Sequence, residues 1–178
     1  VSPGEACYIP LRHSYAGAPD QLPVETVLAR LKPWLEDSTP RKILQHAKYD
    51  QHVFANHGIR LSGIVDDTLL AAYVLEAGQV SPGALELGTL ARRHLGLPTI
   101  PYEAICGKGA NQIGFNQVAV ADAAAYAAED ADITLRLHQA LWPLLQATPA
   151  LQRIYEDMER PLLPVLARIE RNGALVDP

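Results

Sequence analysis

The sequence has little of what several classes of protein require. Its 178 residues include only two cysteines, Cys7 and Cys106, too few for a disulfide framework, so we expect reduced thiols. No uninterrupted apolar stretch approaches the roughly 18 residues of a membrane span. The N-terminal region also lacks the basic segment and apolar run of a signal peptide. These absences predict a soluble, cytoplasmic protein that does not enter a membrane.

Positive charge is also scarce. Fifteen basic residues stand against twenty acidic ones, which gives a net charge of −5. Proteins that bind nucleic acid without sequence preference tend to be basic, so this charge argues against a large duplex-wrapping surface. A small pocket that grips a single-stranded end remains compatible, and the acidic excess suits a site that concentrates divalent cations. The apolar content of 48% is ample for the core of one domain.

Apolar periodicity and breaker residues predict an α/β fold class, with strands and helices in alternation followed by several helices. The expected strands cover residues 6–11, 42–45 and 64–65. The expected helices cover residues 23–36, 49–56, 67–75 and 85–95, with one further turn near Tyr102. Asn116 is the expected N-cap of a long alanine-rich helix that runs to about Trp142, where Pro143 kinks or ends it.

The pair Tyr126 and Asp130 carries the clearest chemical signal. Residues four apart share a helix face, so the phenol and the carboxylate point the same way. A carboxylate can hold a magnesium ion, and a neighbouring phenol can orient a water for attack on phosphate. Asp50 is a second candidate carboxylate. From spacing alone, a solvated helix face is the stronger interpretation of Asp130. For Asp50 the alternative is a helix-start residue that favours the helix dipole.

A set of short blocks, spread over nearly the whole chain, carries a resemblance. They are Tyr8-Ile9-Pro10, Ala18-Pro19-Asp20-Gln21, Lys48-Tyr49-Asp50, Asp67-Thr68-Leu69, Gly107-Lys108-Gly109, Phe115-Asn116-Gln117, Tyr126 to Asp132, and Arg168 to Gly173. With these blocks the chain resembles the 3′–5′ proofreading exonuclease domain of bacterial DNA polymerase I, a family A polymerase. The resemblance implies an RNase H-like (DnaQ-like) fold, a mixed five-stranded sheet flanked by helices.

The resemblance also assigns roles to residues. Asp50 and Asp130 correspond to catalytic ligands of a two-ion site for Mg²⁺ or Mn²⁺, and Tyr126 to the residue that orients the nucleophile. Tyr102 corresponds to an aromatic that touches single-stranded DNA, so we expect it to stack on a terminal base. The remaining expected contacts to the single-stranded 3′ end come from residues around Asp50, namely Gln45, His46 and Lys48. A zinc site built on His46 and Asp50 is disfavoured, because no third ligand is apparent.

One acidic motif of the family is missing from the sequence. Family members carry an Asp-x-Glu on a first strand, N-terminal to the segment that begins here at Ala6, and this chain opens at Val1. We therefore expect an N-terminally truncated domain that lacks its first two strands, keeps about three, and is inactive by itself. In the second motif, His46 stands where the family usually has Asn. A noncatalytic exonuclease-like scaffold for the polymerase domain remains the alternative.

The chain divides into two expected parts. Residues 1–149 correspond to a partial 3′–5′ exonuclease domain, and residues 150–178 to the connection with the first thumb helix of the polymerase. The expected partners are therefore the polymerase domain of the same polypeptide and, for a sheet trimmed at its edge, a second copy of the fragment. A ribonuclease of the RNase D type is a third interpretation. The block at 155–178 speaks against it, because it matches the polymerase side of the connection.

Overall fold

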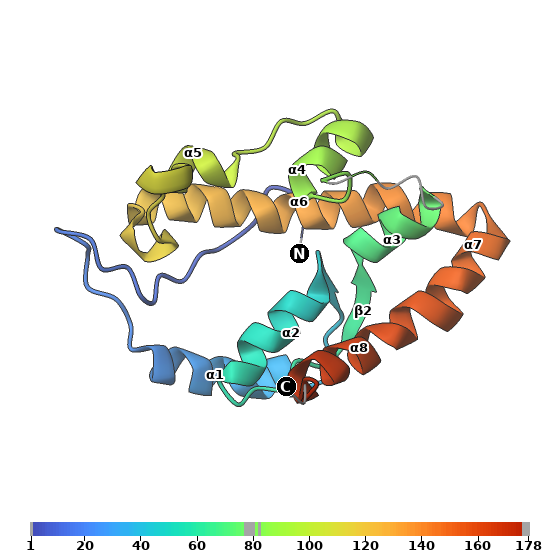
Figure 1. The fold of residues 1–178 in the computed structure, drawn as a ribbon, viewed down its shortest axis with the longest axis horizontal. Coiled ribbons are helices and arrows are strands. Elements are labelled where there is room, and N and C mark those ends of the chain that lie inside the picture. The colour runs from blue at the N-terminus through green and yellow to red at the C-terminus, as the bar shows by residue number, and fades with distance from the viewer. Residues whose placement is uncertain (1, 77–80, 82, 176–178) are drawn as a thin grey trace.

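The computed structural model describes residues 2–76, 81 and 83–175. Two short strands lie among helices, and Figure 1 shows the longest helix running along the long axis of the molecule. The α-helices and strands are α1 (Val24–Glu36), β1 (Lys42–Leu44), α2 (Ala47–Asn56), β2 (Ile64–Asp67), α3 (Thr68–Leu75), α4 (Leu87–Leu90), α5 (Tyr102–Cys106), α6 (Val120–Gln146), α7 (Pro149–Ile154) and α8 (Arg160–Asn172). Two π-helical turns, Ala91–Leu95 and Tyr155–Glu159, and two 3₁₀ turns, Gly109–Asn111 and Phe115–Gln117, complete the order.

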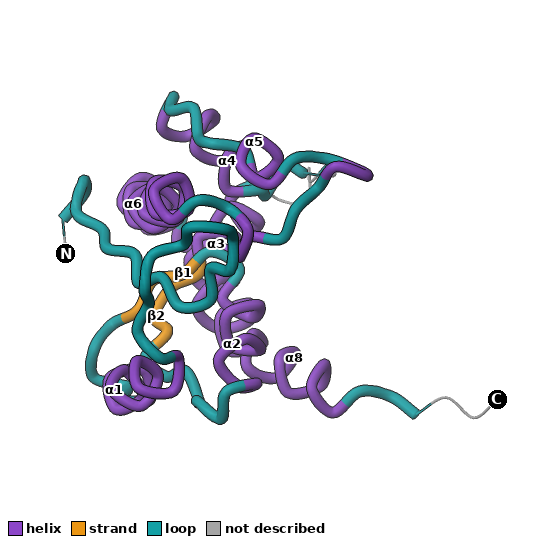
Figure 2. Tube along the Cα trace, turned by 90° about the vertical axis from the view of Figure 1, so that its left-hand side faces the viewer, coloured by secondary structure: helices purple, strands orange, loops and turns teal. Residues whose placement is uncertain are grey.

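The sheet of the described residues is a single parallel pair, β1 and β2, with Leu44 opposite Asp67 at its carboxyl end. Parallel strands need a crossover, and α2 supplies it. Figure 2 shows the two strands enclosed by helices, with α1 on one side and α6 on the other. Because the carboxyl ends of both strands lead directly into helices, the starts of α2 and α3 lie side by side at one edge of the sheet.

The predicted strand at 6–11 is wrong, and so is the expectation of three strands. Residues 5–14 are extended but make no ladder within the described part of the chain. Pro10 has no backbone N–H to donate. Two side chains and one backbone bond anchor the segment instead. The Tyr8 hydroxyl lies 2.5 Å from Nε2 of His13, and Nδ1 of that buried histidine lies 2.9 Å from the Val118 carbonyl oxygen. The Ser14 amide donates to the Asn116 carbonyl oxygen at 2.8 Å.

The long alanine-rich helix α6 is confirmed, although both of its predicted ends are wrong. Asn116 does not cap it, because a 3₁₀ turn intervenes and the helix begins at Val120. At the other end, α6 continues past Pro143 to Gln146. Pro143 lacks the N–H that would bond to the Gln139 carbonyl oxygen, so the helix loses one bond there and still continues. The fully buried Leu145 beyond it keeps the last turn packed.

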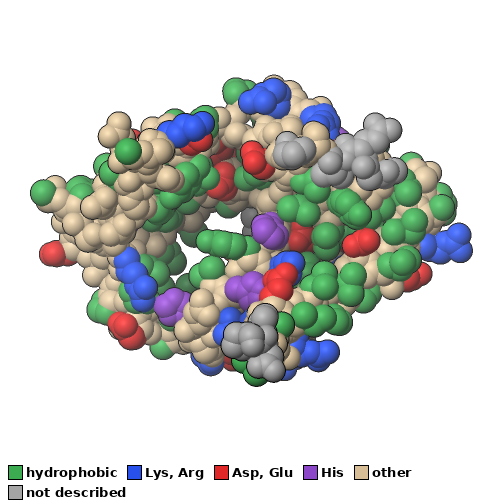
Figure 3. Space-filling model, in the orientation of Figure 1, with side chains coloured by type: hydrophobic (Ala, Val, Ile, Leu, Met, Phe, Trp, Pro, Cys, Tyr) green, Lys and Arg blue, Asp and Glu red, His purple; other side chains and the backbone are tan. Residues whose placement is uncertain are grey.

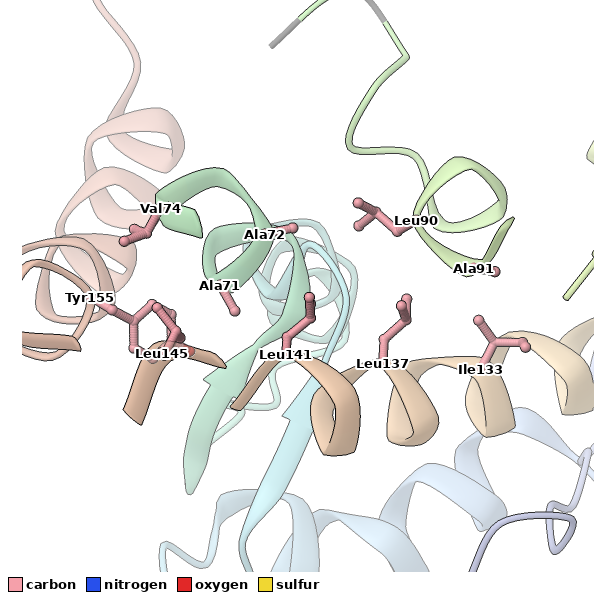
Figure 4. Close-up of a cluster of buried hydrophobic side chains, with 10 residues drawn as sticks. All are labelled: Ala71, Ala72, Val74, Leu90, Ala91, Ile133, Leu137, Leu141, Leu145 and Tyr155. Carbon is pink, nitrogen blue, oxygen red and sulfur yellow. The ribbon is translucent and has the colours of Figure 1, made fainter. Parts of the chain in front are cut away.

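The main core lies along α6. Figure 4 shows Ile133, Leu137, Leu141 and Leu145 in a row on one face of this helix, directed toward α3, α4 and Tyr155. Their spacing of four residues gives the apolar stripe of a helix packed on one side. The fully buried Tyr155 closes the row where the chain turns back after α6. This core fixes α6 against α3, and through α3 against the end of β2.

The other predicted helices are confirmed, with shifted ends. The helix predicted at 49–56 starts two residues earlier, at Ala47, and the one predicted at 85–95 is α4 followed by a π-helical turn. The single turn near Tyr102 is α5. Over the described residues, none of these helices combines the length and apolar character that a membrane crossing needs.

Candidate active site

Helix α6 brings Tyr126 and Asp130 together. Both side chains are half-buried, one helical turn apart, on the N-terminal half of α6. Burial raises the pKa of Asp130 to about 6; the neighbouring Tyr126 hydroxyl opposes this rise and the Glu129 charge adds to it. Burial, followed by the charge of Asp130, raises the pKa of Tyr126 to about 12. The phenol therefore keeps its proton at neutral pH and can donate a hydrogen bond beside an ionisable carboxyl group.

Two further aromatic rings pack against the Tyr126 ring of this pair. The ring of Tyr102 in α5 stacks on that of Phe115 with centroids 6.4 Å apart, and it meets the Tyr126 ring edge-on at 6.2 Å. Phe115 and Tyr126 complete the triangle at 6.0 Å. Such offset and edge-on pairs are favourable arrangements of aromatic rings. Tyr102 remains 41% exposed, so a ring next to Tyr126 is open to a ligand.

Asp50 lies in the first turn of α2. Burial raises its pKa to about 6; His46 opposes the rise, and the carboxylate of Asp67 adds to it. Within the described residues no cation forms an ion pair with Asp50. Asp50 is thus a carboxyl group whose charge the protein itself does not neutralise, which suits the binding of a cation.

The structure connects the start of α2 to the aromatic rings, but it does not couple the two aspartates electrostatically. Tyr49, next to Asp50, is among the groups that raise the pKa of Tyr102. The groups that shift Asp50 and those that shift Asp130 are separate sets, and neither carboxyl group acts on the other. The convergence of both on one metal pocket therefore stays a prediction.

The described residues contain no cluster of three or more histidine, cysteine, aspartate or glutamate side chains that could hold a metal ion. They contain one desolvated carboxyl group on each of two helices, Asp50 on α2 and Asp130 on α6. Mg²⁺ prefers oxygen ligands, keeps several waters, and is commonly held by one or two carboxylates together with substrate phosphate. Asp50 and Asp130 fit that cation in donor type. By themselves they supply few ligands for two ions.

The other predicted contact residues lie around the start of α2, and two of them have protein partners. Gln45 donates to the Leu85 carbonyl oxygen at 3.0 Å and accepts from the Thr68 hydroxyl. Lys48 lies 2.5 Å from a carboxylate oxygen of Glu170. His46 is exposed, and its ring lies near that of Tyr49, with centroids 6.1 Å apart.

Sequence reasoning missed a buried polar network behind the site. The hydroxyl of Tyr155 accepts from the Asp67 amide at 3.0 Å and donates to a carboxylate oxygen of Asp66 at 3.3 Å. The other oxygen of Asp66 lies 3.7 Å from Nδ1 of His138. Burial raises the pKa of Asp66, and the charge of His138 opposes this rise most strongly. The pair Asp66-Asp67 at the end of an apolar run was the available signal, but only the fold shows that Tyr155 reaches it.

A family model and several known proteins are similar to this chain over most of its length. A family model described as 3′-5′ exonuclease, of the DNA polymerase A type, matches residues 1–146. DNA polymerase I of Pseudomonas aeruginosa is 54% identical over 179 residues, which cover 99% of this chain and 19% of that protein. DNA polymerase I of Rhizobium leguminosarum is 42% identical over 97% of this chain and 17% of its own length.

A solved structure is also similar: the POL domain of Pol1 from M. smegmatis in complex with DNA primer-template and dNTP. It has a TM-score of 0.68 and 29% sequence identity, and the match covers 88% of this chain and 23% of that one. The chain thus spans about a fifth of the length of the curated relatives it matches. With its family match over residues 1–146 and relatives of this identity, the chain belongs to the 3′-5′ exonuclease family of DNA polymerase A.

Proposed function

We propose that this chain is the part of a DNA polymerase I that removes mismatched nucleotides from the 3′ end of a primer. The observation that carries the proposal is the pair Tyr126 and Asp130 beside an open aromatic ring, on a helix that lies within the family match. A phenol that keeps its proton next to a desolvated carboxyl group is an arrangement suited to orienting a water.

In this proposal Asp50 and Asp130 hold divalent cations, Mg²⁺ or Mn²⁺. When bound, such ions activate water and offset charge on the departing oxygen of a phosphodiester. The protein contributes the positions of the side chains. Asp130 and Tyr126 come from one rigid helix, so their relative position is fixed by the α6 backbone. The burial that raises the pKa of each aspartate also makes a cation the natural partner of its charged form.

The DNA end binds, in this proposal, against the exposed face of Tyr102. Stacking of a base on an aromatic side chain contributes roughly 1–3 kcal/mol and works for any base. Phe115 and Tyr126 hold that ring from behind. Gln45, His46 and Lys48 are the further contacts we propose for the single strand. Figure 3 shows a hollow between the half that carries α5 and α6 and the half that carries α1 and α2.

We propose that β1 and β2 belong to a larger mixed sheet of the RNase H-like type, and that residues 1–149 form its exonuclease part. Residues 150–178 then lead into the polymerase domain. Helix α8 and the turn before it expose an apolar row at spacings of three and four residues: Met158, Leu162, Val165, Leu166 and Ile169. A helix face of this kind needs a cover. The polymerase domain is the proposed one, and a second copy of the chain is the alternative that sedimentation would reveal.

The 178 residues alone should be nearly inactive, because they supply two carboxylates to a site that needs more ligands for two ions. The test is release of nucleotides from single-stranded DNA with Mg²⁺ or Mn²⁺. We expect no more than trace release by this chain, and release by the full polymerase that Asp130→Ala abolishes. Robust release by the 178-residue chain, lost in Asp130→Ala, would contradict the inactivity. A full polymerase unaffected by Asp130→Ala would contradict the proposed site.

A noncatalytic scaffold is the second candidate, and His46 at a position where the family usually has Asn favours it. Determining the coding sequence upstream of Val1 tests this candidate. An Asp-x-Glu on a strand there supports proofreading, and its absence there supports the scaffold. The rates at which the full polymerase digests DNA and RNA distinguish both the exonuclease and the scaffold from a ribonuclease. A ribonuclease would degrade RNA faster than DNA.

A further inference from the structure

Asp67, the last residue of β2, is bonded to the starts of two helices at once. Its Oδ1 accepts from the amides of Leu69 at 2.9 Å and Leu70 at 3.4 Å, which are in the first turn of α3. The same oxygen accepts from the His46 amide at 3.1 Å, and Oδ2 accepts from the Ala47 amide at 2.8 Å. These last two amides begin α2. The side chain is buried, with only 3% of Asp67 exposed.

Among the described residues, Asp67 is the side chain that caps the start of α2. His46 is in the N-cap position, and its own side chain makes no capping hydrogen bond. The first amides of a helix have no partner within the helix and need one from elsewhere. Asp67 supplies it from the neighbouring strand, because the parallel register sets Leu44 opposite Asp67. Asp50 follows three residues after Ala47, so its position depends directly on where this first turn begins.

The backbone of His46 shows that this start is held tightly. His46 is the one non-glycine residue with positive φ in the described chain, at φ 61° and ψ 50°. Such a conformation is unfavourable for an L-residue and persists only where its surroundings enforce it. The two bonds from Asp67 to the His46 and Ala47 amides are the surroundings that enforce it. The Asp67 amide, in turn, is held by the hydroxyl of the fully buried Tyr155.

We propose that Asp67 is the positioning residue of the site: by clamping the first turn of α2 to the end of β2, it sets where the Asp50 carboxylate lies. In this proposal Asp67 acts through Asp50 and does not itself contact DNA or a cation. The role of Asp50 toward a cation rests on the proposed function, whereas the clamp does not.

Amide hydrogen exchange of the 178-residue chain tests the clamp without any metal. In Asp67→Asn, one acceptor oxygen becomes a donor, so exchange of the His46 and Ala47 amides should rise about tenfold relative to the core of α6. Asp122→Asn is the matched control, because it removes the same charge from an exposed position in the first turn of α6. An equal rise in both variants, after correction for global stability, would overturn the clamp.

If Asp67→Asn does not fold, a measurement on the unaltered chain can still test the clamp. A scalar coupling across the hydrogen bond, from the Ala47 amide nitrogen to the Asp67 carboxyl carbon, should be observable. Its absence would overturn the clamp.

Mn²⁺ titration followed by line broadening tests the positioning. Mn²⁺ should broaden the signals of Asp50 and Asp130 in the unaltered chain, and in Asp67→Asn the affinity at Asp50 should fall about tenfold while that at Asp130 is unchanged. An unchanged affinity at Asp50, or an equal loss in Asp122→Asn, would overturn the positioning role. No broadening at either aspartate of the unaltered chain would contradict the proposed function, and the exchange results would still decide the clamp.

Discussion

Lys48, near the start of α2, lies 2.5 Å from Glu170, near the end of α8. The same glutamate reaches His52 at 2.8 Å, one turn further along α2. Arg171 adds a hydrogen bond of 3.1 Å to Asn56. The helix that carries Asp50 is therefore fastened along its length to the last helix of the chain, which we propose to lead into the polymerase domain.

Glu170→Gln should loosen this contact and lower the midpoint of thermal unfolding slightly. The side chain of Glu170 is exposed, so the effect should shrink as salt is added. Hydrogen bonds from Lys48 and, next in size, from His52 hold the pKa of Glu170 below its usual range. Glu170→Gln removes the carboxylate and with it this favourable interaction. Glu103→Gln is the matched control, because Glu103 pairs with Lys108 only five residues away. A salt-independent loss, or an equal loss in the control, would contradict the ionic contact between α2 and α8.

Leu137→Ala should be strongly destabilising. Leu137 is fully buried in the middle of the α6 row, and removing a leucine side chain from such a core costs about 2–5 kcal/mol. Leu144→Ala, on the same helix at a position 49% exposed, should change the free energy of unfolding by less than about 1 kcal/mol. Urea unfolding of the two variants measures the difference. Similar losses would show that α6 does not bury the face seen in Figure 4.

The helices could be predicted from sequence because their signals are local. The apolar rows of α1 and α6 repeat at helical spacing, and Tyr126 and Asp130 share a face simply because they are four residues apart. Helix ends were less predictable. Asn116 looks like an N-cap, but the chain uses it in a 3₁₀ turn, where its side chain donates to the Ser14 hydroxyl.

The relationships across the strand pair could not be predicted from local signals. An apolar run around Pro10 looks like a strand, yet a strand exists only if another segment offers it a ladder. Asp67 was recognisable as the start of a helix, since it precedes α3. That the same carboxylate also caps α2 follows from the register of β1 and β2, which brings residues about twenty apart in sequence together.

Tyr155→Phe should destabilise the protein although it removes a single oxygen atom. The Tyr155 hydroxyl serves both the Asp67 amide and the Asp66 carboxylate inside the core. Leaving buried polar groups without partners costs about 1–3 kcal/mol. Tyr73→Phe in α3 is the control, because Tyr73 is 41% exposed, and its stability should stay the same. Urea unfolding midpoints decide the matter: no difference between the variants would mean that the hydroxyl of Tyr155 is not part of the network.

Asp50→Asn and Asp130→Asn should each stabilise the metal-free chain at pH 7. Burial raises the pKa of both aspartates from 3.8 to about 6. Well below pH 4 the carboxyl groups are protonated in folded and unfolded chains alike, so their ionisation does not change the free energy of unfolding. As the pH rises from 4 to 6, the unfolded chain loses these protons first, and the folded state loses stability that it does not regain at higher pH.

The gain from each Asn variant at pH 7 should be about 1 kcal/mol, because both carboxyl groups keep contact with water and the penalty is screened. It should vanish below pH 4, and Mg²⁺ should reduce it by stabilising only the aspartate form. Asp122→Asn, at an exposed position in the first turn of α6, should give no gain at any pH. Thermal unfolding across this pH range separates the cases: a gain that persists below pH 4 would show that packing of the amide, and not relief of a buried charge, stabilises the variants.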